Sequence, residues 1–354
     1  MGGIALKMKN IFIATNNGDI GGGEIMLLSI ARVLRSLGKS VTVIGPSFPA
    51  ELIEAAKDEG FSTLALPAYN RKAYIAQLRL WRRRNKYELL WCNGLVPAFA
   101  TAMLGPRIVH FHQLPQKSQK LAAKIAARGA LKTLVPSNFM AKNMPGATVL
   151  YNWVPEIHKT ERPKDRLTKN ISVGFLGRVS EIKGTDLLAQ AIHQLNQSQD
   201  ALNFNLVIGG EARFISDSTQ DKVNSSLAKL GNNLITLGWV DPADFFAQVD
   251  CVAMPSQWDE PFGLVAVEAM SAKVPLLITR SGALPSIVGE DYPWIVEKGS
   301  VESIALGLLN LAQNLTSPTD YLQGIITDNY WRWYEKFSPE AGKSGVKKVI
   351  EQLV

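Results

Sequence analysis

Short apolar runs alternate with helix-like segments along most of the chain, and this alternation constrains the fold more than any other feature. The run at 10–15 leads through a glycine-rich loop into an apolar-periodic stretch at 25–37, which Gly38 closes. Further strand-like runs recur in the first half, at 40–45, 64–66, 89–92, 108–111 and 134–135. Strands that alternate with helices form parallel sheets covered on both faces. We therefore predict a doubly wound α/β domain in this half.

The second half repeats the pattern. Its strand-like runs lie at 171–177, 204–209, 234–237, 251–255 and 275–279. Between the halves, residues 155–165 are polar, contain two prolines and lack periodicity, which is typical of a linker. A length of 354 residues also suits two domains of ordinary size. We expect two doubly wound domains that face each other, with ligands at the carboxyl ends of the strands.

Composition excludes several other classes of protein. With 46% hydrophobic and 19% charged residues, the chain has the material for packed cores. The longest weakly charged stretch, 94–106, is well short of the roughly 20 residues that a membrane-spanning helix needs, and residues 1–7 lack the apolar run of a signal peptide. Cys92 and Cys251 lie far apart in apolar runs, so we expect neither a disulfide nor a cysteine metal site. These features favour a cytoplasmic protein.

The net charge of +7 is divided very unevenly. Residues 1–160 carry a net charge of +13, and the remainder carries −6. Such asymmetry points to a polyanionic or membrane-surface partner for the first half, whereas no recognised nucleic-acid-binding motif is present.

Two segments concentrate the positive charge. Residues 117–132 place lysine or arginine at every third or fourth position, with Leu121, Ile125 and Leu131 available for the inner face of a helix. The second segment, 71–87, mixes cations with three aromatic residues, Tyr74, Trp81 and Tyr87. We expect peripheral attachment to an anionic membrane; ordinary solvated helix faces are the alternative.

Glycine-rich loops follow the first strand of each half. Gly22 and Gly23, next to Glu24, allow close approach of a ligand at a helix start that favours an anion, although a tight turn explains them equally well. In the second half, Arg178 and Lys183 lie in one strand-to-helix loop and can converge on a pyrophosphate; two solvated cations are the alternative.

Two further loops complete the pattern in the second half. Gly209, Gly210 and Glu211 follow the next strand along the chain. The richest stretch is 255–270, in which a Pro-Ser-x-x-Asp-Glu-Pro-Phe-Gly-Leu-Val frame carries Glu260 in a loop and Glu268 inside the following helix. Both carboxylates can accept hydrogen bonds from hydroxyls of a sugar or ribose.

With these motifs in this order, the sequence resembles the retaining, nucleotide-sugar-dependent glycosyltransferases of family 4, over nearly the whole chain. The resemblance implies the GT-B fold, in which two Rossmann-like domains face each other and the last helix crosses back to the first. We expect an acceptor-binding domain at 1–160, joined by the helix at about 337–354, and a nucleotide-sugar-binding domain at 161–336.

The resemblance also implies roles for individual residues. Arg178 and Lys183 would neutralise the donor diphosphate, Glu260 would hold the transferred sugar, and His112 would lie beside that sugar. Glu268 would bind the ribose hydroxyls. The remaining donor-binding residues would be Gly22, Gly23, Gly210, Phe262, Gly263, Leu264 and Val265.

In this family the acceptor hydroxyl is thought to attack on the face from which the diphosphate leaves, so the protein supplies positioning and charge stabilisation. No Asp-x-Asp motif and no metal-ligand spacing of histidines occurs, so we expect neither a metal nor another cofactor. Two departures from the family pattern are Ser286, in place of the usual acid, and Lys273, in place of a common glycine.

The sequence thus predicts a hexosyltransferase that moves sugar from a nucleotide-diphosphate donor to a hydroxyl of a glycan or lipid-linked acceptor, in cell-surface polysaccharide or glycolipid synthesis. Two alternatives stay open. A sugar-nucleotide epimerase or hydrolase of the same fold would consume donor without acceptor, and a non-catalytic binding protein would bind donor without turnover.

Overall fold

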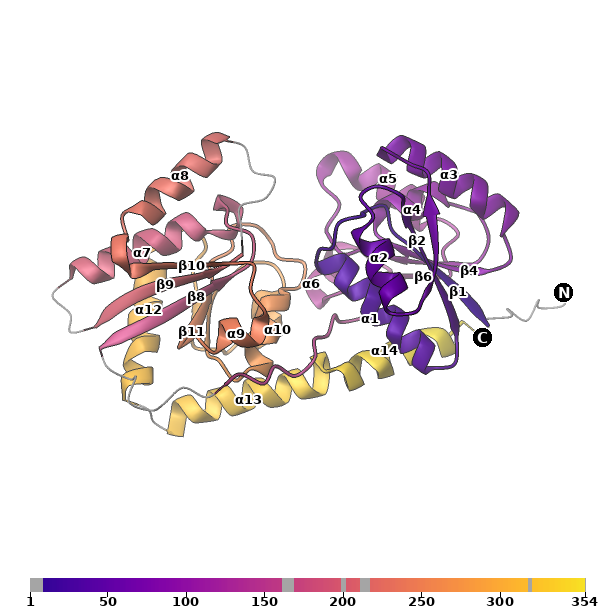
Figure 1. Cartoon of the computed structure of the whole chain (residues 1–354). Coiled ribbons are helices and arrows are strands. Elements are labelled where there is room, and N and C mark those ends of the chain that lie inside the picture. The colour runs from indigo at the N-terminus through magenta and orange to yellow at the C-terminus, as the bar shows by residue number, and fades with distance from the viewer. Residues whose placement is uncertain (1–8, 161–168, 199–201, 211–216, 318–319, 354) are drawn as a thin grey trace. The chain divides into compact units, whose positions relative to one another are not determined.

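The computed structural model describes residues 9–160, 169–198, 202–210, 217–317 and 320–353 (Figure 1). It divides into two compact units. Unit 1 comprises Met1–Asn152 and Glu340–Val354, and unit 2 comprises Trp153–Pro339. Each unit is a parallel sheet with helices on both faces, which confirms the predicted fold class. The domain boundary at residue 160 and the binding roles of the two halves stay predictions.

In the described part of unit 1, seven parallel strands lie in the order β3-β2-β1-β4-β5-β6-β7. Their bounds are β1 (Asn10–Ala14), β2 (Ser40–Pro46), β3 (Ser62–Leu66), β4 (Leu89–Asn93), β5 (Arg107–His110), β6 (Lys132–Val135) and β7 (Thr148–Val149). The central strands are buried on both faces, as their continuous apolar runs predict.

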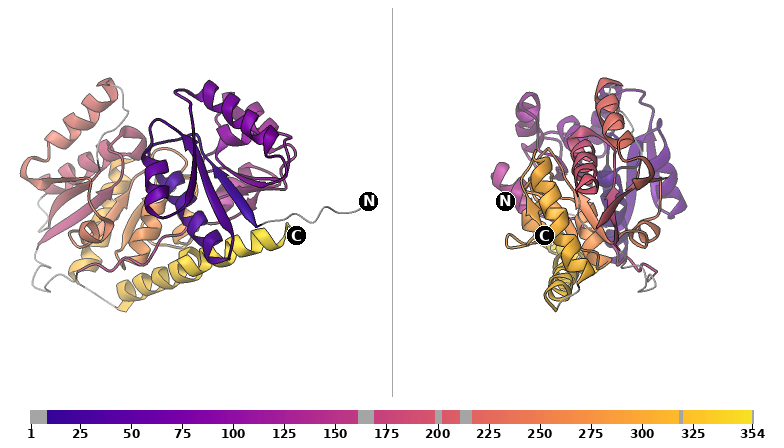
Figure 2. Two further views of the ribbon diagram at one scale, coloured as in Figure 1. Left: turned by 45° about the vertical axis from the view of Figure 1, so that its right-hand side comes forward. Right: turned by 90° about the vertical axis from the view of Figure 1, so that its left-hand side faces the viewer.

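Helices cover both faces of this sheet. They are α1 (Gly22–Ser36), α2 (Glu51–Asp58), α3 (Arg71–Arg84), α4 (Leu95–Ala100), α5 (Lys120–Ala127), which follows the 3-10 turn η1 (Lys117–Gln119), and α6 (Asn138–Asn143). One core cluster joins α3, α4, α5 and α6 to the same face of the sheet (Figures 1 and 2). The Asn70 side chain begins α3 by accepting a hydrogen bond from the Ala73 amide at 2.9 Å.

Unit 2 repeats the design with six described strands in the order β10-β9-β8-β11-β12-β13. The strands are β8 (Asn170–Leu176), β9 (Asn203–Gly209), β10 (Leu234–Gly238), β11 (Cys251–Met254), β12 (Leu276–Thr279) and β13 (Ile295–Val296). The helices are η3 (Glu181–Lys183), α7 (Thr185–Gln197), α8 (Asp217–Ala228), α9 (Pro242–Phe246), α10 (Leu264–Ser271), α11 (Leu284–Val288), α12 (Val301–Thr316) and α13 (Asp320–Phe337).

The last helix, α14 (Pro339–Glu351), belongs to unit 1 although it follows unit 2 in sequence. A Cβ on Gly345 would stand 2.8 Å from Leu150, so the glycine lets α14 pack closely on the end of the first domain. The predicted return crossing is therefore confirmed. None of the helices in the described ranges combines the length and the apolar composition needed to cross a bilayer.

The structure corrects the predicted faces of the basic segments. Leu121 and Leu131 do not face inward, since they are 69% and 46% exposed, and α5 instead buries Ala123 and Ala126. The reason is space: α5 lies close to α4, so only methyl groups fit between them. Ile125 is half-buried.

In the segment at 71–87, Tyr74 is buried and Trp81 packs edge-on against Phe12, with 4.9 Å between ring centroids. Both aromatics therefore serve the core, and only Tyr87 is exposed. Arg82 is also fully buried and donates hydrogen bonds to four backbone carbonyls between residues 85 and 106. It therefore holds a turn together and adds nothing to the surface charge.

Candidate functional site

The two sheets share one topological feature, a point where the strand order reverses. In unit 1 it lies between β1 and β4, and in unit 2 between β8 and β11. Ligands of open α/β sheets bind beyond the carboxyl ends of the strands at such points. The loops that follow these strands carry most of the predicted site residues, so their geometry decides what each unit can bind.

In unit 1, β1, a glycine-containing loop and α1 follow one another in the predicted order. Gly21 caps α1, and the Glu24 carboxylate folds back to accept hydrogen bonds from the Gly21 amide at 3.3 Å and from the Thr15 hydroxyl at 3.2 Å. Burial raises the pKa of Glu24. Gly22 and Gly23 form the first turn of the helix. The Gly21–Glu24 contact adds an acidic cap to the loop, which the glycine pattern alone did not predict.

Gly23 lies beside two polar side chains from neighbouring strands. Asn93, the last residue of β4, donates through Nδ2 to the Gly23 carbonyl at 3.1 Å. Its Oδ1 lies 2.6 Å from Nε2 of His112, which follows β5. A Cβ on Gly23 would stand 3.7 Å from the His112 ring, which is ordinary van der Waals contact, so Gly23 lies directly beside this ring. Burial lowers the pKa of His112 to about 4, which leaves the ring neutral at pH 7.

In unit 2 the loop after β8 is joined to the loop after β9. The Gly177 amide donates to the Gly209 carbonyl at 2.8 Å. Gly210 has a φ of +120°, and a Cβ there would stand 2.2 Å from the Gly177 carbonyl oxygen, so only glycine fits. Glu211 lies outside the described residues. Arg178 extends from this loop as an exposed side chain.

Lys183 and Glu260 form a close ion pair. Lys183 ends η3, and its Nζ lies 2.6 Å from Oε1 of Glu260. The Ser256 hydroxyl donates to the same oxygen at 2.6 Å. Glu260 is 3% exposed, so its charge depends on these two partners. Lys183 Nζ also lies 5.4 Å from the centre of the Trp258 ring, a cation–π contact.

The backbone around Glu260 is fixed by the segment after β12. The Glu260 carbonyl accepts a hydrogen bond from the Ala283 amide at 2.8 Å, and the Ser281 hydroxyl donates to the Trp258 carbonyl. A Cβ on Gly282 would stand 2.3 Å from the Glu260 carbonyl oxygen. Sequence reasoning missed the support that Ser256, Ser281 and Gly282 give. Their position in loops after adjacent strands was the one available signal.

The helix α10 starts against this loop. Gly263 caps it with a φ of +99°, and a Cβ there would stand 2.5 Å from Leu284, which makes glycine necessary. Phe262 is buried against Phe337, so its side chain holds the loop while its backbone stays beside the free amides of the helix start. Leu264 and Val265 are the first two residues of α10.

Glu268 lies one turn into α10, and burial raises the pKa of its carboxyl to about 7. It is therefore close to half protonated at neutral pH. Among the described residues, the structure joins Lys183, Glu260 and Ser256 directly, whereas it records no hydrogen bond or ion pair from the side chains of Arg178 and Glu268 to that group.

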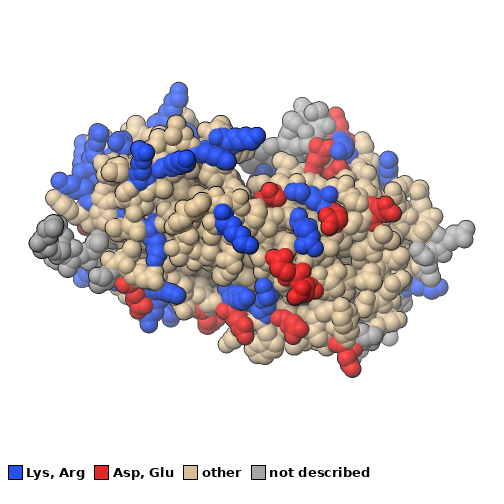
Figure 3. Space-filling model, turned by 180° about the vertical axis from the view of Figure 1, so that it is seen from behind, with Lys and Arg blue, Asp and Glu red and all other residues tan. Residues whose placement is uncertain are grey.

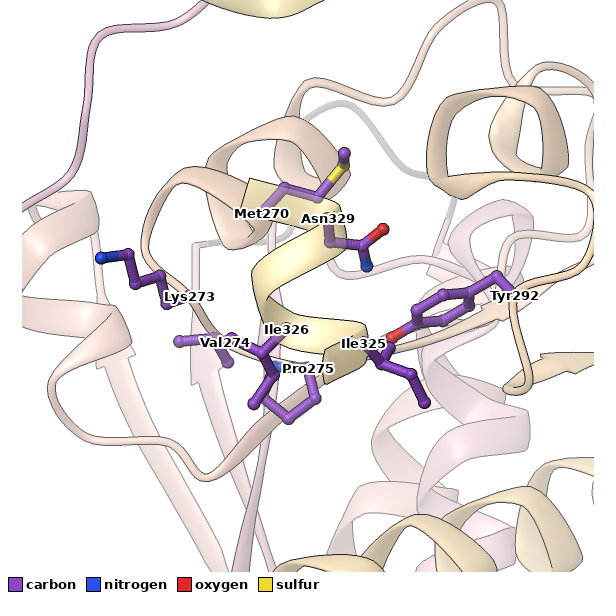
Figure 4. A pocket seen from close by; sticks show the side chains of 8 residues that line it. All are labelled: Met270, Lys273, Val274, Pro275, Tyr292, Ile325, Ile326 and Asn329. Carbon is purple, nitrogen blue, oxygen red and sulfur yellow. The ribbon is translucent and has the colours of Figure 1, made fainter. Parts of the chain in front are cut away.

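The two departures from the family pattern lie away from the Lys183–Glu260 pair. Lys273 has a φ of +55°, and its Nζ lies 4.3 Å from the centre of the Tyr330 ring. Ser286 lies in α11 and donates its hydroxyl to the Ala283 carbonyl at 2.8 Å. Lys273 lines a small pocket between the end of α10 and α13, shown in Figure 4. No predicted site residue lines this pocket.

The chemistry of unit 2 follows from these contacts. Two cations and the Glu260 carboxylate lie on loops at one edge of the sheet, and α10 adds its free amides and the Glu268 carboxylate there. Cations and helix amides bind phosphate oxygens, and carboxylates accept hydrogen bonds from sugar hydroxyls. The arrangement suits a ligand that has an anionic part and a hydroxylated part.

Comparison with known proteins gives two family matches. Residues 20–152 match the family model described as Glycosyltransferase Family 4, and residues 170–314 match Glycosyl transferases group 1. Together the two matches cover more than three quarters of the chain.

Individual relatives are distant. The lipopolysaccharide core biosynthesis mannosyltransferase LpsB of Rhizobium meliloti is 24% identical over 316 residues, which are 85% of this chain and 83% of LpsB. The lipopolysaccharide 1,2-N-acetylglucosaminetransferase of Salmonella typhimurium is 30% identical over 178 residues, which are 44% of this chain and 46% of that enzyme. The chain spans about half the length of the curated relatives that it matches at 30% identity.

Among solved structures, HepE of Anabaena in complex with UDP-glucose superposes with a TM-score of 0.79 at 20% identity, over 97% of this chain and 99% of HepE. At this identity the likeness concerns the fold alone.

Proposed function

The chain belongs to the family 4 glycosyltransferases, retaining hexosyltransferases of the GT-B fold, and from this premise we propose that it transfers a hexosyl group from a UDP-sugar to a hydroxyl of a glycan or lipid-linked acceptor. The observation that carries the proposal is the buried carboxylate of Glu260, which Lys183 and Ser256 hold in the loop before α10. The acidic half of the chain thus has a fixed sugar-binding carboxylate beside a cation.

In this proposal, the donor diphosphate lies against Lys183, Arg178 and the amides at the start of α10. Two positive side chains and a helix start stabilise the charge that develops as the sugar–phosphate bond breaks. Lys183 stays next to Glu260 while it contacts phosphate, because a buried carboxylate needs its cation.

Glu260 and Glu268 bind the two hydroxylated parts of the donor. The described hydrogen bonds of the Glu260 carboxylate converge on Oε1, which leaves Oε2 for a hydroxyl of the transferred sugar. Glu268 accepts hydrogen bonds from the ribose. His112, whose neutral ring faces Asn93 in unit 1, contacts a hydroxyl of the same sugar.

No protein nucleophile is required in this mechanism. The acceptor hydroxyl attacks the anomeric carbon on the face from which the diphosphate departs, and its proton passes to the leaving phosphate oxygen. The configuration is retained, and the protein contributes position and electrostatic stabilisation. We expect the reaction to need no metal or other cofactor.

Two similarities support the choice of donor and acceptor. The HepE structures hold UDP with glucose or UDP-glucose, and two relatives are named for lipopolysaccharide synthesis. UDP is therefore the nucleotide that we propose here, and a cell-surface glycan or its lipid-linked precursor is the acceptor.

A membrane surface is the second partner that we propose, through α3 and α5 of unit 1. Lys117, Lys120, Lys124 and Arg128 are exposed, whereas Lys132 is half-buried, and Figure 3 shows Lys and Arg side chains gathered over the upper part of unit 1. Exposed apolar side chains accompany them: Leu80, Tyr87, Phe99, Met103, Leu121 and Leu131.

This mixture of charge and apolar surface favours an anionic bilayer over a soluble polyanion. Leu121 lies next to Lys120, and Met103 packs against Gly129 just after α5, so apolar groups lie among the cations. Lysine near an anionic membrane contributes about 1 kcal/mol, and buried apolar side chains add to this.

Vesicle flotation tests the membrane partner. We expect binding to phosphatidylcholine vesicles that contain about 30% anionic phosphatidylglycerol, and no binding to vesicles of pure phosphatidylcholine. Lys120→Glu with Lys124→Glu should abolish binding, and Leu121→Ser should weaken it. Lys57→Glu on α2 is the matched control. Equal binding by the α5 variants and the control would contradict the proposal.

Nucleotide binding and turnover test the activity. UDP should raise the thermal midpoint in a concentration-dependent way, and GDP should raise it less. A UDP-hexose should then release UDP only when acceptor extract is added. Release without acceptor would favour the epimerase or hydrolase alternative, and binding without any turnover would favour a non-catalytic protein.

A further inference from the structure

We propose that Asn93 is a positioning residue that holds His112 in the tautomer with its proton on Nε2, so that Nδ1 faces the substrate as a hydrogen-bond acceptor. The tautomer follows from contacts inside unit 1. The contact between Nδ1 and the substrate rests on the proposed function, since it requires a hydroxylated ligand at this end of the sheet.

The orientation of the Asn93 amide is determined by the Gly23 carbonyl. A carbonyl oxygen can only accept, so the nitrogen of the amide must face it, and the distance from Nδ2 to that oxygen is 3.1 Å. The Oδ1 atom of Asn93 then faces the His112 ring. Asn93 is 3% exposed, so water does not compete for either contact.

The tautomer of His112 follows from the amide. Its Nε2 lies 2.6 Å from Oδ1 of Asn93, which has lone pairs and no proton. If the ring carried its proton on Nδ1, two lone pairs would face each other at that distance. Nε2 must therefore donate, and the neutral ring keeps its lone pair on Nδ1.

Nδ1 of His112 is the atom left for a ligand. It is buried and has no hydrogen-bond partner among the described residues. Buried polar atoms in folded proteins are almost always paired, so an unpaired acceptor at the carboxyl ends of β1, β4 and β5 indicates a group that a ligand satisfies. A sugar hydroxyl supplies the matching donor.

The surroundings keep the ring uncharged. The titratable group that faces it from β5 is His110, whose ring centroid lies 4.2 Å away and whose pKa burial also lowers. On α1, Glu24 directly follows Gly23, and its carboxylate accepts hydrogen bonds from the Thr15 hydroxyl and the Gly21 amide. Asn93 contributes an acceptor without a negative charge, whereas an aspartate there would favour the imidazolium.

Nitrogen-15 spectra of the imidazole rings test the tautomer without any assay of activity. The chain has four histidines, so His112→Gln identifies the His112 signals. At pH 7 we expect a protonated Nε2 and an unprotonated Nδ1 in the intact, ligand-free protein. A proton on Nδ1, or a charged ring, would overturn the proposal.

Two substitutions of Asn93 then separate positioning from simple structural support. Asn93→Ala should give a mixture of both tautomers, and Asn93→Asp should raise the His112 titration midpoint by at least one pH unit, as expected beside a carboxylate (about 1 unit or more). Asn138→Asp, an exposed change in the same unit, should leave the His112 signals unchanged.

Kinetics of the same variants test the role in substrate contact. At saturating UDP-sugar, kcat of Asn93→Asp should fall as the pH is lowered through the raised His112 midpoint, while the wild-type kcat stays level over that range. An unchanged pH profile would remove His112 from substrate contact. If no transfer occurs with any UDP-sugar, the spectra still decide the tautomer, so failure of the proposed function and failure of this inference are distinguishable.

Discussion

Lys183 and Arg178 share a predicted role, yet their side chains lie in different environments. Lys183 is paired with the buried carboxylate of Glu260, whereas Arg178 is exposed and forms no ion pair among the described residues. We therefore expect loss of Lys183 to affect both the proposed donor site and the folded state. We expect loss of Arg178 to affect the proposed donor site alone.

Lys183→Gln and Arg178→Gln should each lower kcat by about 10²–10³, the usual effect of removing one group that stabilises transition-state charge. The thermal midpoint should fall for Lys183→Gln and stay within error for Arg178→Gln. Lys229→Gln is the control, because Lys229 is an exposed lysine of unit 2 that lies just after α8 and outside the loops of the proposed site. Wild-type turnover by Lys183→Gln would remove Lys183 from the mechanism.

On the proposed function, we expect Glu268 to make donor binding depend on pH. Its pKa is raised to about 7 by burial, and a ribose hydroxyl binds the ionised form best, so UDP binding must remove the proton at low pH. We expect Kd for UDP to be about tenfold weaker at pH 6 than at pH 8, since one pKa unit corresponds to about 1.4 kcal/mol. Calorimetry of the wild type and of Glu268→Gln measures this dependence.

The raised pKa of Glu268 also predicts how the stability of the ligand-free protein depends on pH. A carboxyl whose pKa is raised on folding stabilises the fold below its unfolded pKa of about 4.3 and loses that contribution as pH rises through 7. Glu268→Gln should therefore be more stable than wild type at pH 8, by about 1–2 kcal/mol for a partly exposed group. A level UDP affinity between pH 6 and 8 in the wild type would contradict the binding statement, and equal stability of the two proteins at pH 8 would contradict the stability statement.

At the scale of elements, the loop that carries Glu260 depends on a glycine in the neighbouring loop. Gly282 has a φ of +57°, and a Cβ there would stand 2.3 Å from the Glu260 carbonyl oxygen and 2.4 Å from its nitrogen. The space under the Glu260 loop is therefore filled by backbone, and a methyl group must push the loop away.

Gly282→Ala should lower turnover at least tenfold, because displacements of about 1 Å have such effects on positioned groups. Gly231→Ala is the matched control, since Gly231 has a φ of +52° and open space around its Cα. Both variants carry the cost of a left-handed alanine, about 1 kcal/mol. Equal activity of the two variants would show that the Gly282 contact does not position Glu260.

The elements themselves were largely predictable. Strands such as β1, β8 and β11 have continuous apolar runs, and the loops after them have glycines, so the alternating pattern identified a pair of parallel sheets. The buried face of each helix and its packing partners were less predictable. Periodicity places Leu121 on a helix but cannot show that α4 leaves room only for alanine.

In the candidate site, contacts between residues that are distant in sequence could not be predicted either. Lys183 and Glu260 are 77 positions apart, and each was chosen from its own motif, but the ion pair between them depends on adjacent strands. Asn93 is clearer still. Asn93 ends β4, and its role as the link between Gly23 and His112 appears only in the structure.

In the whole molecule, each unit carries a different set of the proposed site residues. Unit 2 carries the cations and carboxylates that we assign to the donor, and unit 1 carries His112, its supporting amide and the basic, partly apolar surface. The charge division of the sequence, +13 for residues 1–160 against −6 for the rest, matches this division of roles. The proposed site residues are thus divided between the two units.

The most direct test of the central claim is one experiment with UDP-hexoses and an acceptor extract, in which released UDP is measured and the new linkage is characterised by NMR. We predict UDP release that depends on acceptor, together with a product that keeps the α configuration of the donor. Release of UDP without acceptor, or a β-linked product, would contradict it.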